Sequence, residues 1–144
     1  MSMKAKLAES NFASLAAMMS AYAEEAVRVA WQDHHQRLDL SESSVDPLEM
    51  ILDGQSADDV EFQTRLWGSY FGEVILRRFG GEWELSQYPG PGGGVSPVPT
   101  LLIQGSRLYP LIKVYRRLTL GAAEDLSAFY KLVSDRLGKR PPVN

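Results

Sequence analysis

The clearest pattern of apolar positions lies between Ala57 and Trp83. Apolar residues recur there mostly every three, four or seven positions, which predicts one long amphipathic helix over 57–79. Its apolar stripe comprises Val60, Leu66, Trp67, Tyr70, Phe71, Val74 and Ile75. Ser56 can cap the start of this helix, and one glycine of Gly80-Gly81 can end it in the left-handed conformation. We expect the other elements to pack around it.

Two glycines, Gly68 and Gly72, lie four positions apart inside this helix. A glycine weakens a helix by up to about 1 kcal/mol relative to alanine, so both positions need a physical reason. We interpret them as points where another helix or strand approaches the backbone closely. A ligand that passes over the bare backbone is the alternative.

Shorter apolar patterns predict two helices before the long one. The first covers about 10–37, after a frayed start at 1–9. The second lies within 41–53, where Asp46 is the expected cap. An earlier start of this second helix, capped by Ser41, is the alternative.

A polar and apolar alternation follows Gly81 and predicts a half-buried strand over 82–87. Trp83 and Leu85 are expected to face inward on this strand. The next stretch, Tyr88 to Pro99, holds four prolines and four glycines, so we expect a long exposed loop without regular structure.

Two more strands are predicted at 100–104 and 107–109, joined by a two-residue turn at Gly105-Ser106. Helical patterns then return at 111–118 and 121–137, before a polar tail at 139–144. Leu111, Val114, Tyr115 and Leu118 are expected to face the core. The sequence therefore predicts a single α+β domain over residues 1–144, with helices flanking a small three-stranded antiparallel sheet.

Composition limits the class of protein. With 144 residues and 44% hydrophobic residues, the chain is long enough for one domain with a real core. It contains no cysteine, which excludes disulfides and zinc-thiolate sites. We find no apolar run of membrane-spanning length and no signal peptide, so we expect a cytoplasmic protein without a membrane partner.

The net charge of −3 is unevenly distributed. Residues 24–61 contain 11 acidic and 2 basic residues, whereas residues 62–144 contain 11 basic and 6 acidic ones. Such asymmetry predicts an acidic and a basic face, and each can bind a charged partner or simply remain solvated. Nucleic-acid binding is disfavoured because the acidic segment repels phosphate and the isoelectric point is about 5.4.

Glu73 borders the apolar stripe of the long helix and precedes Arg77 by four residues, the favourable order for a helical ion pair. We interpret Glu73 as a structural residue whose partner is Arg77, a backbone amide or the hydroxyl of Tyr70. A general acid or base is the alternative interpretation.

The densest basic cluster is Lys113, Arg116 and Arg117, which helical spacing places together on one face of a helix, beside the face that points to the core. We predict a surface patch that binds an acidic partner or the acidic segment of a second copy. His34 and His35 lie near a helix end, and no metal or cofactor is expected because the spacing of known ligand sets is missing.

Three segments resemble a family of small uncharacterised bacterial proteins. They are Tyr70-Phe71-Gly72-Glu73 on a helix, the Gly80-Gly81-x-Trp83 turn, and the stretch from Tyr109-Pro110 to Phe129-Tyr130. The resemblance covers roughly residues 40–137. It implies a bacterial α+β domain without an established activity, and it supplies no catalytic residues.

Two functions follow as hypotheses. The first is a non-enzymatic protein–protein interaction module, either an adaptor or an immunity-type inhibitor, and a homodimer is compatible with it. The second is a small enzyme in which Glu73 is the acid or base beside the basic cluster. The first is favoured because the sequence has no nucleophile motif, metal-ligand set or cofactor fingerprint.

Overall fold

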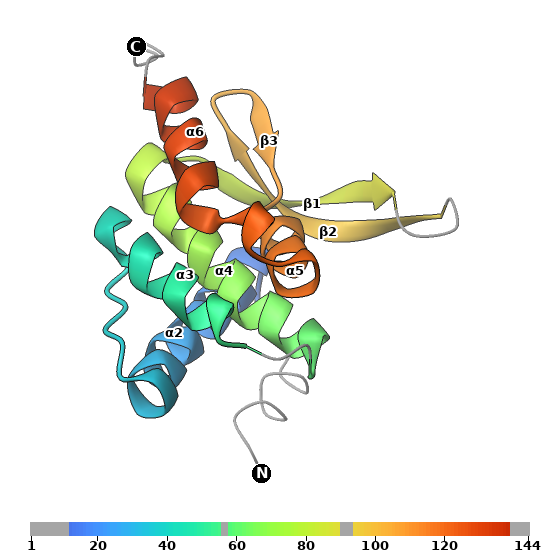
Figure 1. Cartoon of the computed structure of the whole chain (residues 1–144). Coiled ribbons are helices and arrows are strands. Elements are labelled where there is room, and N and C mark those ends of the chain that lie inside the picture. The colour runs from blue at the N-terminus through green and yellow to red at the C-terminus, as the bar shows by residue number, and fades with distance from the viewer. Residues whose placement is uncertain (1–11, 56–57, 90–93, 139–144) are drawn as a thin grey trace.

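The computed structural model describes residues 12–55, 58–89 and 94–138. Within them the chain forms an α+β fold, as the sequence predicts: three α-helices, then a three-stranded antiparallel sheet, then two α-helices (Figure 1). The helices are α2 (Leu15–His34), α3 (Val45–Asp53), α4 (Val60–Phe79), α5 (Pro110–Leu120) and α6 (Leu126–Gly138). Short 3-10 turns precede α3 and α6, at Glu42–Ser44 (η1) and Ala122–Glu124 (η3). No helix of the described residues is long and apolar enough to cross a membrane.

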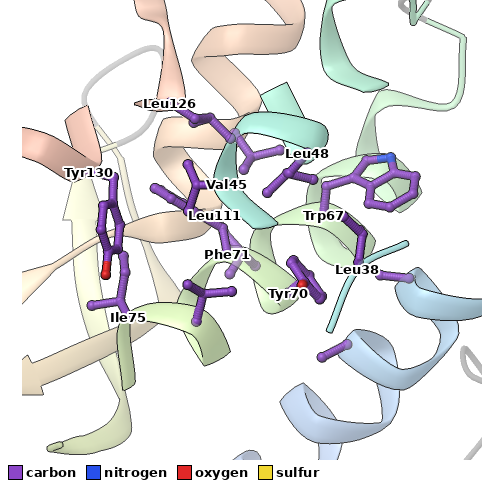
Figure 2. Close-up of a cluster of buried hydrophobic side chains, with 14 of the residues drawn as sticks. Leu38, Val45, Leu48, Trp67, Tyr70, Phe71, Ile75, Leu111, Leu126 and Tyr130 are labelled. Atoms are coloured by element: carbon purple, nitrogen blue, oxygen red, sulfur yellow. The ribbon is translucent and has the colours of Figure 1, made fainter. Parts of the chain in front are cut away.

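The long helix α4 runs through the middle of the molecule, with α2, α3 and α5 around it (Figure 1). Its residues 66–72 are all buried, because neighbouring elements cover more than one side of the helix. Figure 2 shows Trp67, Tyr70 and Phe71 of α4 among apolar side chains of the surrounding elements. The prediction that the chain packs around this helix is therefore confirmed.

The two helical glycines are points of close approach, as expected. A Cβ on Gly68 would lie 2.8 Å from the Cα of Leu111 in α5. A Cβ on Gly72 would lie only 2.2 Å from the indole ring of Trp83 and 3.1 Å from Pro110. Trp83 itself is 9% exposed, so this ring is a core side chain lying against the bare backbone of α4.

Several helix boundaries differ from the prediction. Helix α2 begins after the cap Ser14, whose side chain accepts a hydrogen bond from Ala17 N at 3.1 Å, and it ends at His34 rather than near residue 37. Asp46 does not cap α3: it lies inside the first turn, and η1 lies in front of it, nearer to the alternative start at Ser41.

The ends of α4 also correct the sequence interpretation. The expected cap Ser56 lies outside the described residues, and Asp59 occupies the cap position. At the other end, Gly80 has a φ of 76° but a ψ of −169°, so it is not in the left-handed helical conformation. Gly81, with a φ of 110°, lies so close to β2 that a Cβ would come within 2.5 Å of Leu102 O, and only glycine fits there.

The sheet is larger than expected. Strand β1 is Glu82–Pro89, β2 is Val95–Ile103 and β3 is Ser106–Leu108. Most of the predicted loop over 88–99 is therefore strand: Tyr88 pairs with Ser96 and Pro89 with Val95, while residues 90–93 lie outside the described residues. The paired ribbon of β1 and β2 projects beyond the helices (Figure 1).

Local details of the sheet correct three further expectations. The two-residue turn is Gln104-Gly105, one position earlier than predicted, and both residues have the positive φ of a type I′ turn (53° and 80°). Leu85 is 60% exposed because β1 leaves the body of the molecule after Trp83. Tyr115 of α5 is also exposed, whereas Leu111 and Val114 are buried as expected.

Candidate functional site

The structure separates the three cations that the sequence grouped together. The side chain of Arg117 is only 4% exposed, so it does not contribute to a surface patch. Lys113 and Arg116 both contact Glu124 of η3. The prediction of one patch formed by all three residues is therefore wrong, and its two parts have different roles.

Arg117 joins three helices. Its Nε donates to Glu49 Oε1 at 2.9 Å, and its Nη2 donates to Glu49 Oε2 at 2.8 Å and to Asp53 Oδ1 at 2.7 Å, so α5 is tied to α3. Glu49 Oε1 also accepts a hydrogen bond from the backbone N–H of Leu126 at the start of α6. The hydrogen bonds to Glu49, above all, raise the pKa of Arg117. Arg117 therefore connects α5 to α3 inside the fold and is not part of an exposed patch.

Lys113 and Arg116 hold one carboxylate between them. Lys113 Nζ lies 2.7 Å from Glu124 Oε2, and Arg116 Nη2 lies 3.0 Å from Glu124 Oε1. The hydrogen bond from Lys113 is the main cause that lowers the pKa of Glu124, so this carboxyl is ionised at neutral pH. Lys113 Nζ also lies 5.3 Å from the ring centre of Phe129, within cation–π distance.

These residues line a cavity of about 320 Å³ where the sheet meets α5, η3 and α6. The rings of Tyr88 and Tyr109 meet edge to face in its wall, with centres 5.1 Å apart. Arg107 of β3 adds a third cation, and its Nε donates to Glu84 Oε1 at 2.7 Å. The cavity therefore combines aromatic surface with cationic groups.

A second, more apolar cavity of about 250 Å³ continues from the first, because Leu108 and Phe129 line both. Its other lining residues include Leu132, which is 69% exposed, and Arg136. We call the two together the hairpin groove. Arg107, Lys113, Arg116 and Arg136 line this groove with a single carboxylate, Glu124, in a chain whose net charge is −3.

Glu73 and Arg77 lie in a different cavity. It has a volume of about 210 Å³, lies between α2 and α4, and shares no lining residue with the hairpin groove. Within the described chain, no hydrogen bond or ion pair of normal geometry joins the Glu73 carboxylate to Arg77. The hydroxyl of Tyr70 is also engaged elsewhere: it accepts from Leu40 N at 2.8 Å and lies 2.7 Å from Ser44 Oγ.

Burial raises the pKa of Glu73, and the nearby charge of Arg77 and the indole N–H of Trp83 only partly oppose this effect. Tyr70 is therefore not the expected partner of Glu73, whereas the indole N–H of Trp83 and the charge of Arg77 both favour its ionised form, and the interpretation of Glu73 as a structural residue stays a prediction. The alternative of an acid or base beside the basic cluster is unsupported, because the two sites are separate cavities.

The two histidines lie at a helix end, as the sequence interpretation states. His34 is the last residue of α2 and lies against the ring of Trp67, and His35 caps the helix in the left-handed conformation. The described residues contain no group of three or more metal-ligating side chains.

Sequence reasoning missed most of the hairpin groove. Tyr88 was assigned to a loop, and Arg107, Phe129 and Arg136 were not chosen as site residues. These side chains come from three elements that are separated in sequence, β1, β3 and α6, so only the strand register and the docking of α6 bring them together.

Comparisons with known proteins give information about the fold and none about the function. No protein-family model and no curated protein matches the chain. A crystal structure at 1.50 Å resolution of a protein from Bacteroides thetaiotaomicron VPI-5482 is similar, with a TM-score of 0.62 and 16% sequence identity. The match covers 82% of this chain and 43% of that chain, so the present chain corresponds to less than half of its neighbour's length.

Proposed function

We propose that this chain is a non-enzymatic interaction module, an adaptor or an immunity-type inhibitor in the cytoplasm, that binds an acidic amphipathic segment of a partner protein in the hairpin groove. One observation carries the proposal: an acidic chain gathers four cations and one carboxylate around a cleft of aromatic and aliphatic side chains. Electrostatic attraction of this kind speeds association and selects partners of opposite charge.

The composition of the groove supports binding by contact as well as by charge. Tyrosine and arginine are enriched among the residues that dominate binding energy at protein interfaces. The groove presents Tyr88, Tyr109 and several arginines beside the exposed Leu132. A partner segment with alternating apolar and acidic residues would place its apolar side chains against Leu108 and Phe129 and its carboxylates against the arginines.

Glu124 supports an acidic ligand in particular. Its carboxylate already accepts hydrogen bonds from Lys113 and Arg116 at the edge of the groove. The guanidinium of Arg116 is half exposed, so it retains donors for a second carboxylate. The enzymatic alternative has no comparable support, because Glu73 and these cations face separate cavities.

The test compares two triple variants with the same change of charge. Arg107→Ala/Arg116→Ala/Arg136→Ala removes three cations of the groove. Arg28→Ala/Arg65→Ala/Arg78→Ala removes three exposed arginines elsewhere, each also in an ion pair. Both are used as bait in cells that naturally carry the chain, and captured proteins are quantified by mass spectrometry at low and high salt.

We expect the groove variant to lose a partner that the wild-type and control proteins retain at low salt, and we expect high salt to weaken capture by the wild type. The binding segment of that partner, made as a peptide, should be acidic and amphipathic. If both variants capture the same proteins in the same amounts, or if the captured segment is basic, the proposal is wrong. Capture of the chain itself would identify the partner as a second copy.

A further inference from the structure

Strand β1 is an outermost strand of the sheet, whose order is β1-β2-β3. Its eight residues pair one to one with β2 from Glu82 to Pro89, so β1 contains no bulge. After the buried Trp83 the ribbon extends beyond the helices, and Leu85 is 60% exposed (Figure 1). The other edge of this long and regular strand therefore faces away from β2.

The register shows which backbone groups of β1 point to this outer edge. The backbone groups of Ile103 bond to β3 beside the two-residue turn, so those of Leu102 bond to Glu82 of β1. Because this direction alternates along a strand, the N–H and C=O groups of Leu85 and Gln87 point away from β2. Apart from strand pairing, neither residue makes a backbone hydrogen bond within the described chain. These donors and acceptors are the groups that a further strand would use.

The side chains of β1 suit antiparallel pairing with the β1 strand of a second copy. When the two strands pair about Leu85, this residue faces Leu85 of the second copy, and two exposed apolar side chains come together. Glu84 then faces Ser86 and Glu82 faces Tyr88, so no carboxylate lies directly opposite another. The strand also contains no lysine, a residue that commonly prevents pairing at exposed strand edges.

We propose that two copies of this chain pair through the outer edges of their β1 strands and form a symmetric dimer with one continuous antiparallel sheet. Its two-fold axis passes between the two Leu85 residues, so each copy contributes the same surface. The contact consists mainly of one pair of strand edges, so the dimer is weak and depends on concentration. The dimer does not depend on the proposed function. Its value for binding rests on that function: two hairpin grooves in one particle bind a partner with two acidic segments by avidity.

The test measures the molar mass of the full chain by sedimentation velocity. Concentrations extend up to about 100 µM, well above a dissociation constant of roughly 1 µM. Leu85→Lys places two ammonium groups at the two-fold axis and should oppose pairing. Leu132→Lys is the matched control, because it makes the same change at a leucine that is 69% exposed but lines the hairpin groove.

A second pair of variants separates the backbone of the strand edge from its side chains. Gln87→Pro removes an N–H that points to the outer edge, and proline is tolerated at such positions of edge strands. Gln87→Ala changes the same side chain but keeps the N–H. Thermal melting followed by circular dichroism checks that each variant is folded, and Leu85→Lys tests the proposal even where the proline variant is not.

We expect the wild type to approach twice its mass of 16.0 kDa as its concentration rises. Leu85→Lys and Gln87→Pro should each raise the dissociation constant of the dimer at least about tenfold, whereas Leu132→Lys and Gln87→Ala should dimerise like the wild type. The proposal is overturned if the wild type stays monomeric at every concentration or if Leu85→Lys dimerises as the wild type does. It is also overturned if Leu132→Lys abolishes the dimer, which would place the contact in the hairpin groove.

Discussion

At the scale of single residues, Glu73 shows how a buried charge opposes folding. Its pKa in the folded protein is raised above the value in the unfolded chain, mainly by burial. The contribution of the Glu73 side chain to the free energy of unfolding is therefore largest at pH values below the unfolded-state pKa. It is lost as the pH rises through the folded-state pKa. We predict that Glu73→Gln melts at a higher temperature than the wild type at about pH 7.5 and at the same temperature at about pH 3.5.

Differential scanning calorimetry of both proteins across this pH range measures the effect. Glu61→Gln is the control, because it removes a carboxylate of the same helix whose side chain is 80% exposed and whose ion pair with Arg65 contributes little. A melting temperature of Glu73→Gln below the wild-type value at neutral pH would show that the interactions of Glu73 with Arg77 and Trp83 outweigh the cost of its burial.

Arg116 and Arg117 are neighbours in sequence and opposites in role. Arg117 is 4% exposed and makes hydrogen bonds to Glu49 and Asp53, whereas the side chain of Arg116 is 50% exposed. We predict that Arg117→Ala lowers the free energy of unfolding by about 3–5 kcal/mol, because it leaves the largely buried carboxylate of Glu49 without its cation and with only the backbone N–H of Leu126 as a donor. Arg116→Ala should cost less than about 1 kcal/mol. Urea unfolding at pH 7 measures both, and equal costs would contradict the structural role of Arg117.

At the scale of elements, the docking of the sheet on α4 depends on the absence of a side chain at Gly72. We predict that Gly72→Ala lowers the free energy of unfolding by about 1–3 kcal/mol or more, despite the better helix propensity of alanine, because its Cβ would overlap the indole of Trp83. Gly54→Ala is the control, since a Cβ there meets nothing closer than 3.8 Å. Trp83→Phe, which introduces a smaller ring, should lower the free energy of unfolding less in the Gly72→Ala protein than in the wild type. Chemical denaturation of the wild type, the two single variants and the double variant measures this coupling.

The helices could be predicted because their signal is local. Helix α4 keeps its apolar stripe over five turns, and the structure moves only its first residues relative to the prediction. Strand β2 could not be predicted in full, since Pro97 and Pro99 indicate a loop in any local reading. Residues 95–99 form a strand because they pair with β1, and a pattern within one segment does not show such a pairing.

The same reasoning explains which part of the candidate sites the sequence showed. Lys113 and Arg116 stand out by their spacing on one helix, and they do line the groove. Arg117 has the same spacing, but only the position of α3 reveals that Glu49 and Asp53 neutralise it. The sequence also could not show that Tyr70 is not the partner of Glu73, because the hydroxyl of Tyr70 contacts Leu40 and Ser44 in three dimensions.

At the scale of the whole molecule, much of the charge in the described residues is neutralised by internal ion pairs. The acidic residues Glu49 and Asp53 are used by Arg117, and Glu124 is used by Lys113 and Arg116. The counts of acidic and basic residues in each half therefore overstate the field that a partner meets. In the hairpin groove, Arg107 and Arg116 are also in ion pairs but remain about half exposed, so the salt dependence of binding should reflect these arginines and Arg136.

The prolines of β2 also affect how this protein behaves in a crowded solution. In the register of β2 with β3, the backbone groups of Leu101 and Ile103 point toward β3. Because this direction alternates along a strand, the backbone groups of Pro97 and Pro99 point to the same side. Strand β3 is too short to reach these two positions. Proline has no N–H, so this unpaired edge offers no donor at these two positions to a foreign strand. An exposed strand edge on a projecting ribbon would otherwise be a template for edge-to-edge aggregation. Pro97 and Pro99, which made β2 look like a loop in the sequence, therefore also hinder the pairing of another chain with this edge.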